Sequence, residues 1–558
     1  MLDPLAAAAK HIPVASNTPV PWQLLLVGAI PKELLPGLMS EAARLRDARK
    51  CIRVGSDCTG GDSFWDMLKQ MQGAYNKIST DVKYENCMTS EDPGPGGKAA
   101  IKFILANSKP KQLLYDSSSR HAHHAWCAVT NGTVRMEKLS WYVAGTVCKD
   151  RSRCNMRRKP LDIEVEMGTS SRTLASSLKY IEEEEPDRVL LEFVVDLKFV
   201  TVVLEKFRHL EKYLTVAFCM NAQYVGDLTS RTRVYIIGIN AYTNKIIKPL
   251  SEWADLLDTF ARALPKRSVE DILLPDSHPL IVAGRSGLES NYFAQSSAAH
   301  DEANEGVGWE LEYAKHCRAR SDIKKKTGKI IPNVAELAKS DLCTGDLRFT
   351  SARPRDLVLM HKWVVRKLFN DVDSAQHFLW DAALGIEFAK FHKQADRDRG
   401  ITCLRTNSRL YDTSSRRDRW LHGAELLYAL GFSKTTDISG LTTRDLTGLA
   451  GNAISIRVLA CLHALVTCTT RFEDVPPADA RQQLLVSSTR AKLIEYVGPC
   501  NQFVQESNDD SMCLLYKKEK VSEEDSEGAG DGGAKRKLRR KKSSPEENMA
   551  SDWQYDLA

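Results

Sequence analysis

Arg53-Val54-Gly55-Ser56-Asp57-Cys58-Thr59-Gly60-Gly61-Asp62-Ser63 is the stretch of this chain that decides the fold. A short β-rich run passes into a turn of small residues, and the helical stretch Phe64–Gln72 follows directly. A turn of this kind lets a ligand approach the backbone, and the N-terminus of the following helix attracts anions and carboxylates. Because the Gly-x-Gly-x-x-Gly pattern is absent, the stretch alone predicts a strand–turn–helix unit and leaves open whether the turn binds a ligand.

The same alternation of short apolar runs and helical stretches continues to about residue 239. The runs are Ile52–Gly55, Val82–Met88, Leu113–Tyr115, Leu139–Ala144, Val189–Val195, Leu214–Met220 and Val234–Ile239. Strands that alternate with helices indicate βαβ units around a mostly parallel sheet. The sequence therefore predicts an α/β fold with a Rossmann-like sheet.

Changes in composition divide the chain into six predicted segments. They are an N-terminal extension (1–45), the main part of an α/β core (46–242), an insert (243–414), a C-terminal part of the core (415–475), a C-terminal extension (476–516) and a tail (517–558). The N-terminal extension leads into a short predicted helix, Lys32–Asp47. The insert loses the strand–helix rhythm but carries helical stretches such as Leu250–Leu264 and Leu357–Asn370.

Composition and length favour an intracellular globular protein. Of the 558 residues, 43% are hydrophobic and 27% charged, and the net charge of +6 is compatible with a polyanionic partner without requiring one. The 14 cysteines include no Cys-x-x-Cys pair, which favours free thiols in a reducing compartment. We expect neither a signal peptide nor a membrane span, because no charged start precedes an apolar core and no apolar stretch approaches roughly 20 residues.

The tail has almost no apolar content, so we predict that it is disordered. It runs from an acidic group into the basic block Lys535–Lys542. A block of this kind can be a nuclear address, a DNA-binding arm or simply a solvated segment, and all three interpretations stay open.

Metal-binding residue types gather at His121, His123, His124 and Cys127. A zinc site needs tetrahedral geometry and usually a second ligand pair at a characteristic spacing, which this sequence lacks. We therefore predict no metal site.

Four positions have the residue types of a catalytic site. Cys148 follows a buried-strand pattern and has two cationic neighbours, which favour the nucleophilic thiolate, although a structural cysteine beside a turn is the alternative. Glu192 lies inside an apolar run, where burial would raise its pKa and let it hold a proton near neutral pH. Arg231 and Arg233 fall on one face at the start of a strand, a spacing that suits contacts to an acceptor-rich substrate.

Two acidic residues stand at predicted strand ends. Glu91 follows the second strand, where nucleotide-binding folds place the carboxylate that takes ribose hydroxyls. Asp116 follows the third strand, where it could accept a hydrogen bond from an adenine amino group. A solvated carboxylate is the alternative at Glu91.

Taken in order, these motifs resemble those of the cytosine-5 DNA methyltransferase family. The resemblance covers about residues 51–240 and 411–469, and its most specific matches are Cys148, Arg231/Arg233 and Gly451-Asn452-Ala453. It implies a sheet of the S-adenosylmethionine-dependent methyltransferase type with an inserted target-recognition region. The cofactor S-adenosylmethionine would bind at Asp57, Thr59, Gly60, Gly61, Glu91 and Asp116, and Asn452 and Ser455 would close over it.

The resemblance also implies a reaction on a cytosine flipped out of double-stranded DNA. The Cys148 thiolate would attack C6 and make C5 nucleophilic, while Glu192 would hold the N3 edge and share a proton with it. Arg233, with Arg231, would steady the charge that develops around O2. The insert would contact the grooves and phosphates of the DNA.

Several positions depart from the family's pattern. Val147 and Lys149 replace the Pro and Gln of Pro-Cys-Gln, and Phe193 replaces the Asn of Glu-Asn-Val. Thr229 replaces the Gln before Arg-x-Arg, and Asp62 replaces a turn glycine, where it would crowd or repel the cofactor carboxylate. The sequence thus predicts a divergent, monomeric DNA methyltransferase of the nucleus. A non-catalytic nucleic-acid-binding relative and a tRNA cytosine-5 methyltransferase remain alternatives, although the long insert argues against the smaller tRNA-modifying branch.

Overall fold

The computed structural model describes a large part of the chain, with gaps. The described residues are 20–38, 51–78, 82–91, 97–114, 123–146, 169–195, 197–297, 320–321, 323–325, 328–350, 352–368, 379–382, 401–414, 416–487 and 492–495. The predictions for Asp116, Cys148 and the tail from residue 517 therefore lie outside the described residues.

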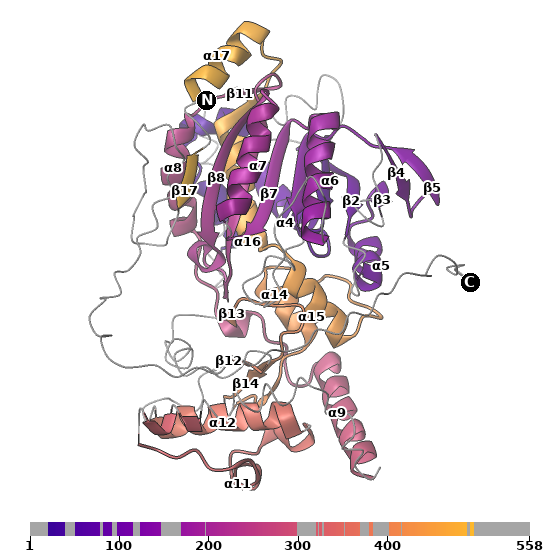
Figure 1. Ribbon diagram of the computed structural model, residues 1–558, viewed down its shortest axis with the longest axis vertical. Helices are drawn as coiled ribbons and strands as arrows, with labels where there is room; N and C mark the ends of the chain where they lie inside the picture. The colour runs from indigo at the N-terminus through magenta and orange to yellow at the C-terminus, as the bar shows by residue number, and fades with distance from the viewer. Residues whose placement is uncertain are drawn as a thin grey trace, which may run out of the picture. The chain divides into compact units, whose positions relative to one another are not determined.

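A ten-stranded sheet forms the centre of the fold, in the order β17-β8-β10-β7-β6-β1-β2-β3-β4-β5 (Figure 1). Its strands are β1 Ile52–Asp57, β2 Tyr84–Ser90, β3 Gln112–Leu114, β4 His124–Cys127, β5 Gly132–Arg135, β6 Trp141–Gly145, β7 Arg188–Val194, β8 Tyr213–Asn221, β10 Thr232–Asn240 and β17 Lys492–Glu495. Strands β3, β2, β1, β6 and β7 run parallel, whereas β10 is antiparallel to both β7 and β8. All seven predicted runs form strands, and the predicted α/β, Rossmann-like fold is confirmed.

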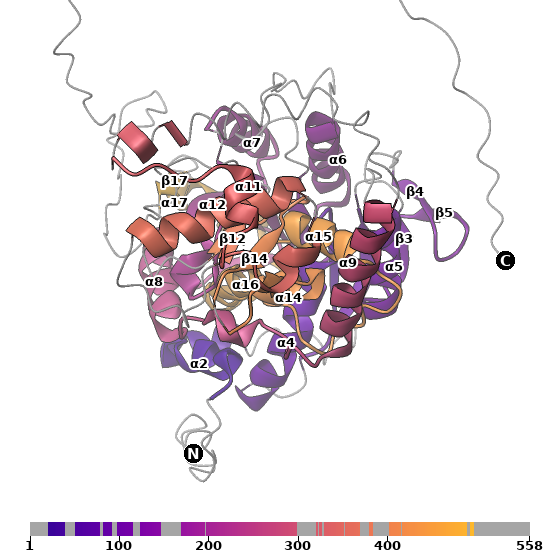
Figure 2. The ribbon, with the colours of Figure 1, turned by 90° about the horizontal axis from the view of Figure 1, so that it is seen from below.

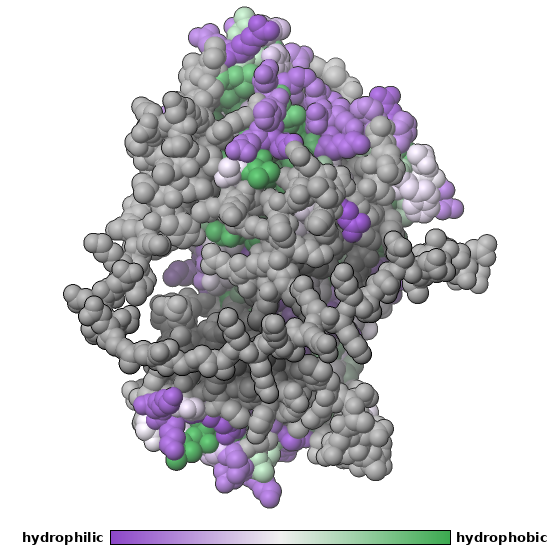
Figure 3. Space-filling model, in the orientation of Figure 1, coloured by the Kyte–Doolittle hydropathy of each residue, from purple (hydrophilic) through white to green (hydrophobic). Residues whose placement is uncertain are grey.

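Helices cover both faces of this sheet. One face packs on α2 (Trp22–Gly28), α4 (Ser63–Ile78), α8 (Trp253–Ala263) and α16 (Ile456–Thr469), which share a single apolar core with the strands. The other face packs on α6 (Thr169–Glu184) and α7 (Leu197–His209), which lie in front of the sheet in Figure 1. Both α6 and α7 turn hydrophilic side chains outward, as Figure 3 shows, because an amphipathic helix buries only one stripe.

Helix α16 is buried along its whole length. Together with α15 (Thr443–Asn452) it forms the one stretch among the described residues, Thr443–Thr469, that has the length and mean hydropathy of a membrane span. Since 89% of its apolar window is buried inside the protein, the stretch has the environment of a core helix.

The insert has an apolar core of its own, which runs from Ile323 to Tyr411. Its elements include α9 (Pro279–Ser297), α11 (Val334–Ala338) and α12 (Ala352–Leu368), together with the small sheet of β12 (Leu379–Asp381), β14 (Leu410–Asp412) and β15 (Arg419–Trp420). Figure 2 shows α9 and α12 on the viewer's side of α14 (Gly423–Ala429) and α15.

The first part of the predicted insert and the C-terminal extension both contact the central sheet unit. Helix α8 packs on α16, and β11 (Asn244–Ile246) pairs with β16 (Thr470–Phe472), although both α8 and β11 come after residue 243. Strand β17 pairs with β8, so the C-terminal extension adds a strand to the sheet. The β4–β5 hairpin was not predicted. Of the predicted helix Lys32–Asp47, the structure describes residues 32–38, where a 3-10 turn (Lys32–Leu34) precedes the helical residues 35–38.

Candidate active site

The turn after β1 lies at the edge where the carboxyl ends of the parallel strands meet, the usual place for ligands in such sheets. Gly60 and Gly61 have φ of +69° and +79°, a backbone conformation that favours glycine. The Gly61 N–H donates to Glu91 Oε1 at 3.0 Å, which ties the turn to the end of β2. A Cβ on Gly60 would lie 2.3 Å from the backbone nitrogen of Ala453. Residues 60, 91 and 453, far apart in sequence, therefore meet at one point.

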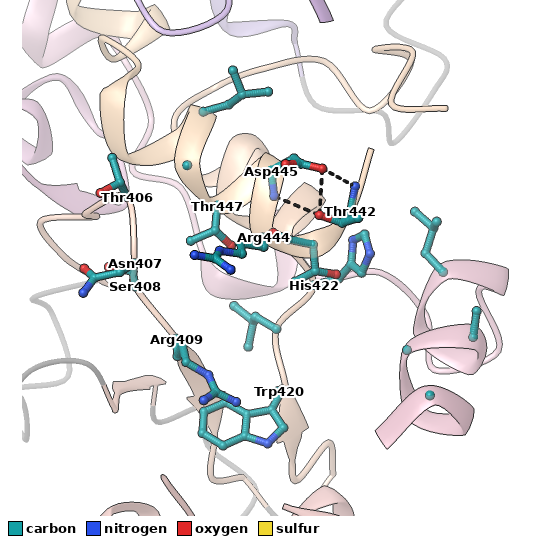
Figure 4. A pocket seen from close by; sticks show the side chains of 18 of the residues that line it. Thr406, Asn407, Ser408, Arg409, Trp420, His422, Thr442, Arg444, Asp445 and Thr447 are labelled. Atoms are coloured by element: carbon teal, nitrogen blue, oxygen red, sulfur yellow. Dashed lines mark hydrogen bonds between the residues drawn. The ribbon is translucent and has the colours of Figure 1, made fainter. Parts of the chain in front are cut away.

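A cavity of about 1480 Å³ begins at this point. Gly60, Glu91 and Asn452 line one end of it, so three of the predicted cofactor-binding residues share one cavity. The other end reaches the insert and is lined by residues that include Arg409 and Trp420. Figure 4 shows these two side chains together, with the Arg409 guanidinium 5.0 Å from the centre of the Trp420 ring.

Other predicted cofactor-binding residues lie outside the lining of this cavity. The Asp57 carboxylate is buried and accepts hydrogen bonds from the hydroxyls of Ser90 and Tyr142. The Thr59 side chain is also buried and donates to Ser56. Ser455 caps the N-terminus of α16, and its hydroxyl donates to Asp227 at 2.6 Å.

The carboxylate of Asp62 is turned into the protein. It accepts hydrogen bonds from Ser56 at 2.8 Å, from Asn86 at 2.7 Å and from Thr89 at 3.1 Å. Burial raises its pKa, and these hydrogen bonds oppose that effect. The expected repulsion of a cofactor carboxylate therefore has no support in the geometry, because Asp62 serves as the polar centre that joins β1, β2 and the turn.

The three described residues of the predicted catalytic set form one buried cluster. In the antiparallel register of β7 and β10, Glu192 lies opposite Tyr235, two residues from Arg233. Glu192 Oε1 lies 3.0 Å from Arg233 Nε and 3.7 Å from Arg231 Nη2. Arg231 Nη1 also donates to the Gly451 carbonyl at 3.1 Å, which connects the cluster to the end of α15. All three charges are within 12% side-chain exposure, so their mutual attraction is weakly screened.

Several polar atoms of this cluster have no hydrogen-bond partner among the described residues. They are Glu192 Oε1, whose approach to Arg233 is an ion pair rather than an aligned hydrogen bond, Arg231 Nε, the Tyr235 hydroxyl and the Thr229 hydroxyl. Burial raises the Tyr235 pKa, and the nearby Glu192 charge adds to the rise. An unsatisfied buried polar atom costs about 1–3 kcal/mol, so three such atoms beside the Glu192–Arg233 ion pair suit a site for a polar ligand.

One residue of the cluster was missed by sequence reasoning. Cys403 follows β13 (Ile401–Thr402), which pairs in parallel with β9 (Thr229–Ser230), and its Sγ lies 3.7 Å from Arg233 Nη2. Burial raises the pKa of the Cys403 thiol, but Arg233 and Arg231 outweigh burial and hold that pKa below its ordinary value. No local motif marks this position, because β13 comes from the insert and meets β9 across a long sequence separation.

Two of the motif departures have a clear structural setting. The Phe193 side chain is buried in the core beneath α6 and α7, on the sheet face opposite to Glu192. Thr229 is fully buried beside the cluster. The departures at Val147 and Lys149 lie outside the described residues.

The histidine cluster of the sequence does not converge within the described residues. His123 Nδ1 lies 2.6 Å from Glu184, His124 is exposed, and Cys127 is buried in the β4–β5 hairpin. The described part of the chain contains no group of three His, Cys, Asp or Glu residues arranged for a metal ion, and His121 lies outside it.

Comparison with known proteins finds similar solved structures but no matching sequence. Neither a protein-family model nor a curated protein sequence matches the chain. It is similar to the structure of the Dnmt2 methyltransferase of S. pombe, at 11% identity over 74% of this chain and 97% of that one, with a TM-score of 0.36. It is similar to the Entamoeba histolytica methyltransferase EhMeth, at 12% identity over 75% and 98% of the two chains (TM-score 0.36). A Spodoptera frugiperda DNMT2 mutant gives 14% identity over 74% and 99% (TM-score 0.35).

Proposed function

We propose that this protein is a DNA (cytosine-5)-methyltransferase that uses S-adenosylmethionine and a covalent Cys148–C6 intermediate. The observation that carries the proposal is the buried Glu192–Arg231–Arg233 cluster at the carboxyl ends of the strands, tied through Gly451 to α15. Asn452, the next residue, lines the cavity that also contains Gly60 and Glu91.

The residues at the Gly60 end of the cavity fit S-adenosylmethionine. Glu91 offers a carboxylate at the end of β2, the place from which acidic residues bind ribose hydroxyls. The glycine turn keeps side chains away from the backbone, and Asn452, whose backbone lies against Gly60, adds a polar residue to the lining. When bound, the cofactor supplies an electrophilic methyl group. Asp116 remains a proposed contact to its adenine, and Asp57, Thr59, Gly61 and Ser455 would support the turn and the helix that flank it.

The cluster fits the polar edge of a cytosine. Glu192 would hold a proton toward N3, while Arg231 and Arg233 would donate to O2 as negative charge develops in the ring. In the proposed reaction the Cys148 thiolate adds to C6, C5 takes the methyl group, and loss of the C5 proton breaks the C6–sulfur bond. The base would reach the cluster only after flipping out of the duplex.

The insert and the basic block are the proposed sources of DNA contacts. Arg409 and Arg444 both line the cavity, as Figure 4 shows, and the net charge of +6 suits a polyanion. The basic block Lys535–Lys542 would direct the protein to the nucleus or add phosphate contacts. We propose that the protein acts as a monomer.

The direct test incubates the full chain with methyl-labelled S-adenosylmethionine and assorted duplexes. Transfer of label to C5 of cytosine is the expected result. Binding of the cofactor without transfer to any duplex would contradict the proposal.

The replaced motif residues Phe193 and Thr229 favour a second candidate, a nucleic-acid-binding relative without activity. In that case the protein would bind duplexes and transfer no label. A competition between duplex DNA and tRNA in the same assay separates the DNA enzyme from a tRNA methyltransferase of the same chemistry.

A further inference from the structure

Cys403 has unusual surroundings for a thiol that the proposed reaction does not use. Its Sγ lies 3.7 Å from Arg233 Nη2, and its side chain remains partly exposed. Among the charges around it, Arg233 and Arg231 lower the thiol pKa, and Glu192 raises it. The cations outweigh both the carboxylate and burial, so the thiolate is favoured.

Most other described thiols with a resolved shift move in the opposite direction. Burial raises the pKa of Cys87 to about 11 and the pKa values of Cys461 and Cys468 to about 12. Cys127 also has a lowered pKa, because backbone hydrogen bonds outweigh its burial, but its side chain is fully buried. Cys403 therefore combines a stabilised thiolate with access from solvent.

The cluster that Cys403 contacts through Arg233 also contains buried polar atoms without partners. Arg231 Nε, Glu192 Oε1 and the Tyr235 hydroxyl are at least nine-tenths buried and lack hydrogen-bond partners among the described residues. Glu192 Oε1 lies 3.0 Å from Arg233 Nε and 3.7 Å from Arg231 Nη2, so these atoms belong to the charged cluster that Cys403 contacts through Arg233. An oxygen atom added to the Cys403 thiol would lie beside the Arg233 guanidinium, whose Nη2 is 3.7 Å from Sγ.

We propose that Cys403 is a modification site, where small peroxides oxidise the thiol to a sulfenic acid beside Arg233. The thiolate attacks one peroxide oxygen, the O–O bond breaks, and hydroxide leaves and is protonated to water. The sulfur loses two electrons and the peroxide gains them. A thiol reductant reverses the step through a mixed disulfide.

The consequence for activity rests on the proposed function. The sulfenic oxygen would accept hydrogen bonds from the Arg233 guanidinium. In the proposed reaction the same guanidinium donates to the cytosine O2. Oxidation of Cys403 would therefore block the substrate base without touching the cofactor end of the cavity.

The experiment measures thiol reactivity directly and needs no methyl transfer. The full-length protein is treated briefly with iodoacetamide between pH 6.5 and 8.5, and labelling of Cys403 and Cys343 is quantified by peptide mass spectrometry. Cys343 is partly exposed as well and serves as the internal reference. We expect Cys403 to react at least about threefold faster at pH 7, since the rate follows the thiolate fraction. A parallel sample treated with hydrogen peroxide and dimedone should carry the adduct on Cys403.

Two variants should change the labelling rate of Cys403 in opposite directions. Arg233→Gln removes the nearest cation and should slow labelling of Cys403, whereas Glu192→Gln removes the opposing carboxylate and should speed it. General unfolding would speed labelling in both variants and at Cys343. Equal rates at Cys403 and Cys343, no dimedone adduct, or no opposite response in the two variants would overturn the proposal, whatever the outcome of the methyl-transfer assay.

Discussion

Glu192 is held in its position by charge rather than by hydrogen-bond geometry. Its Oε1 lies within 3.7 Å of two guanidinium nitrogens, one from Arg233 on the neighbouring antiparallel strand β10 and one from Arg231 just before that strand. A buried carboxylate with two cations and unsatisfied donors beside it is poised to exchange partners when a ligand enters.

Replacement of this carboxylate tests its proposed role. We expect Glu192→Gln to lower kcat for methyl transfer by about 10²-fold or more, the usual range for a lost acid–base group, while cofactor affinity is unchanged. The matched control Glu182→Gln changes an exposed residue of α6 and should leave kcat as it was. A kcat within a factor of two of the unsubstituted protein would remove Glu192 from the mechanism.

Asp62 is expected to matter for stability rather than for cofactor repulsion. Asp62→Ala leaves Ser56, Asn86 and Thr89 without their buried acceptor and should lower the free energy of unfolding by about 2–4 kcal/mol. Urea unfolding provides the measurement. A gain in cofactor affinity without loss of stability would restore the repulsion predicted from the sequence.

At the residue scale, the sequence identified the residue types of the cluster but not its full membership. Glu192, Arg231 and Arg233 are marked by charge within apolar strands. Cys403 has no such mark, because its chemistry comes from Arg233 and not from its sequence neighbours. The roles predicted for Asp57 and Ser455 came from position in a motif, and their hydroxyl and carboxylate partners became visible only in the fold.

Among the elements, the contact between α15 and the turn after β13 joins the cavity to the Glu192–Arg231–Arg233 cluster. A Cβ on Gly451 would lie 2.2 Å from the backbone nitrogen of Thr406, and the Gly451 carbonyl accepts from Arg231. Because the clash would be with backbone, only a shift of the segment could relieve it.

We therefore expect Gly451→Ala to separate these elements. The unfolding free energy should fall by about 1–3 kcal/mol, and methyl transfer should fall with it because Arg231 loses its anchor. Gly448→Ala is the matched control on the same helix, since no atom lies within 4 Å of the added Cβ. Removing a helix glycine there should raise stability by up to about 1 kcal/mol. Equal effects of the two substitutions would show that the close contact is unimportant.

Local periodicity explains which elements could be predicted. Strands β1, β2, β6, β7, β8 and β10 are apolar runs with clear ends, and every one of them was found at the expected place. The β4–β5 hairpin was missed because its exposed side alternates histidine, tryptophan and arginine, which mask the strand pattern. The pairing of β17 with β8 and of β13 with β9 depends on contacts between distant segments, which no local pattern reports.

Across the whole molecule, stability should depend on pH through a buried histidine of α16. His463 is enclosed by the rings of Phe64, Tyr84 and Trp141, and its Nδ1 contacts the Tyr75 hydroxyl at 2.9 Å. Burial, assisted by the charge of Arg188, lowers its pKa to about 3 from an ordinary value near 6.5. Between pH 6.5 and pH 3 the unfolded chain binds a proton at this histidine, whereas the folded chain does not. The contribution of neutral His463 to the free energy of unfolding is therefore fully present above pH 6.5 and is lost as pH falls toward 3.

Through His463, the free energy of unfolding should fall by about 2 kcal/mol between pH 7 and pH 5. His463→Phe removes it, so the fall in thermal midpoint over that interval should be smaller than in the unsubstituted protein by a few degrees. The pH dependence is compared rather than the absolute midpoint, because the substitution also leaves the Tyr75 hydroxyl without its partner. The same fall in both proteins would show that His463 is not the acid-sensitive group.

The central claim is that the Cys148 thiolate attacks C6 of a cytosine bound at the Glu192–Arg231–Arg233 cluster. Trapping of the covalent protein–DNA complex tests this claim most directly. The full-length protein is mixed with S-adenosylmethionine and a duplex that contains 5-fluorocytosine, which cannot lose a C5 proton, and covalent complexes are resolved on a denaturing gel. Cys343→Ser is the control for the loss of any partly exposed thiol. We predict a complex with the unsubstituted protein and with Cys343→Ser, and none with Cys148→Ser. A complex that persists in Cys148→Ser, or no complex from protein that binds both cofactor and duplex, would contradict the account.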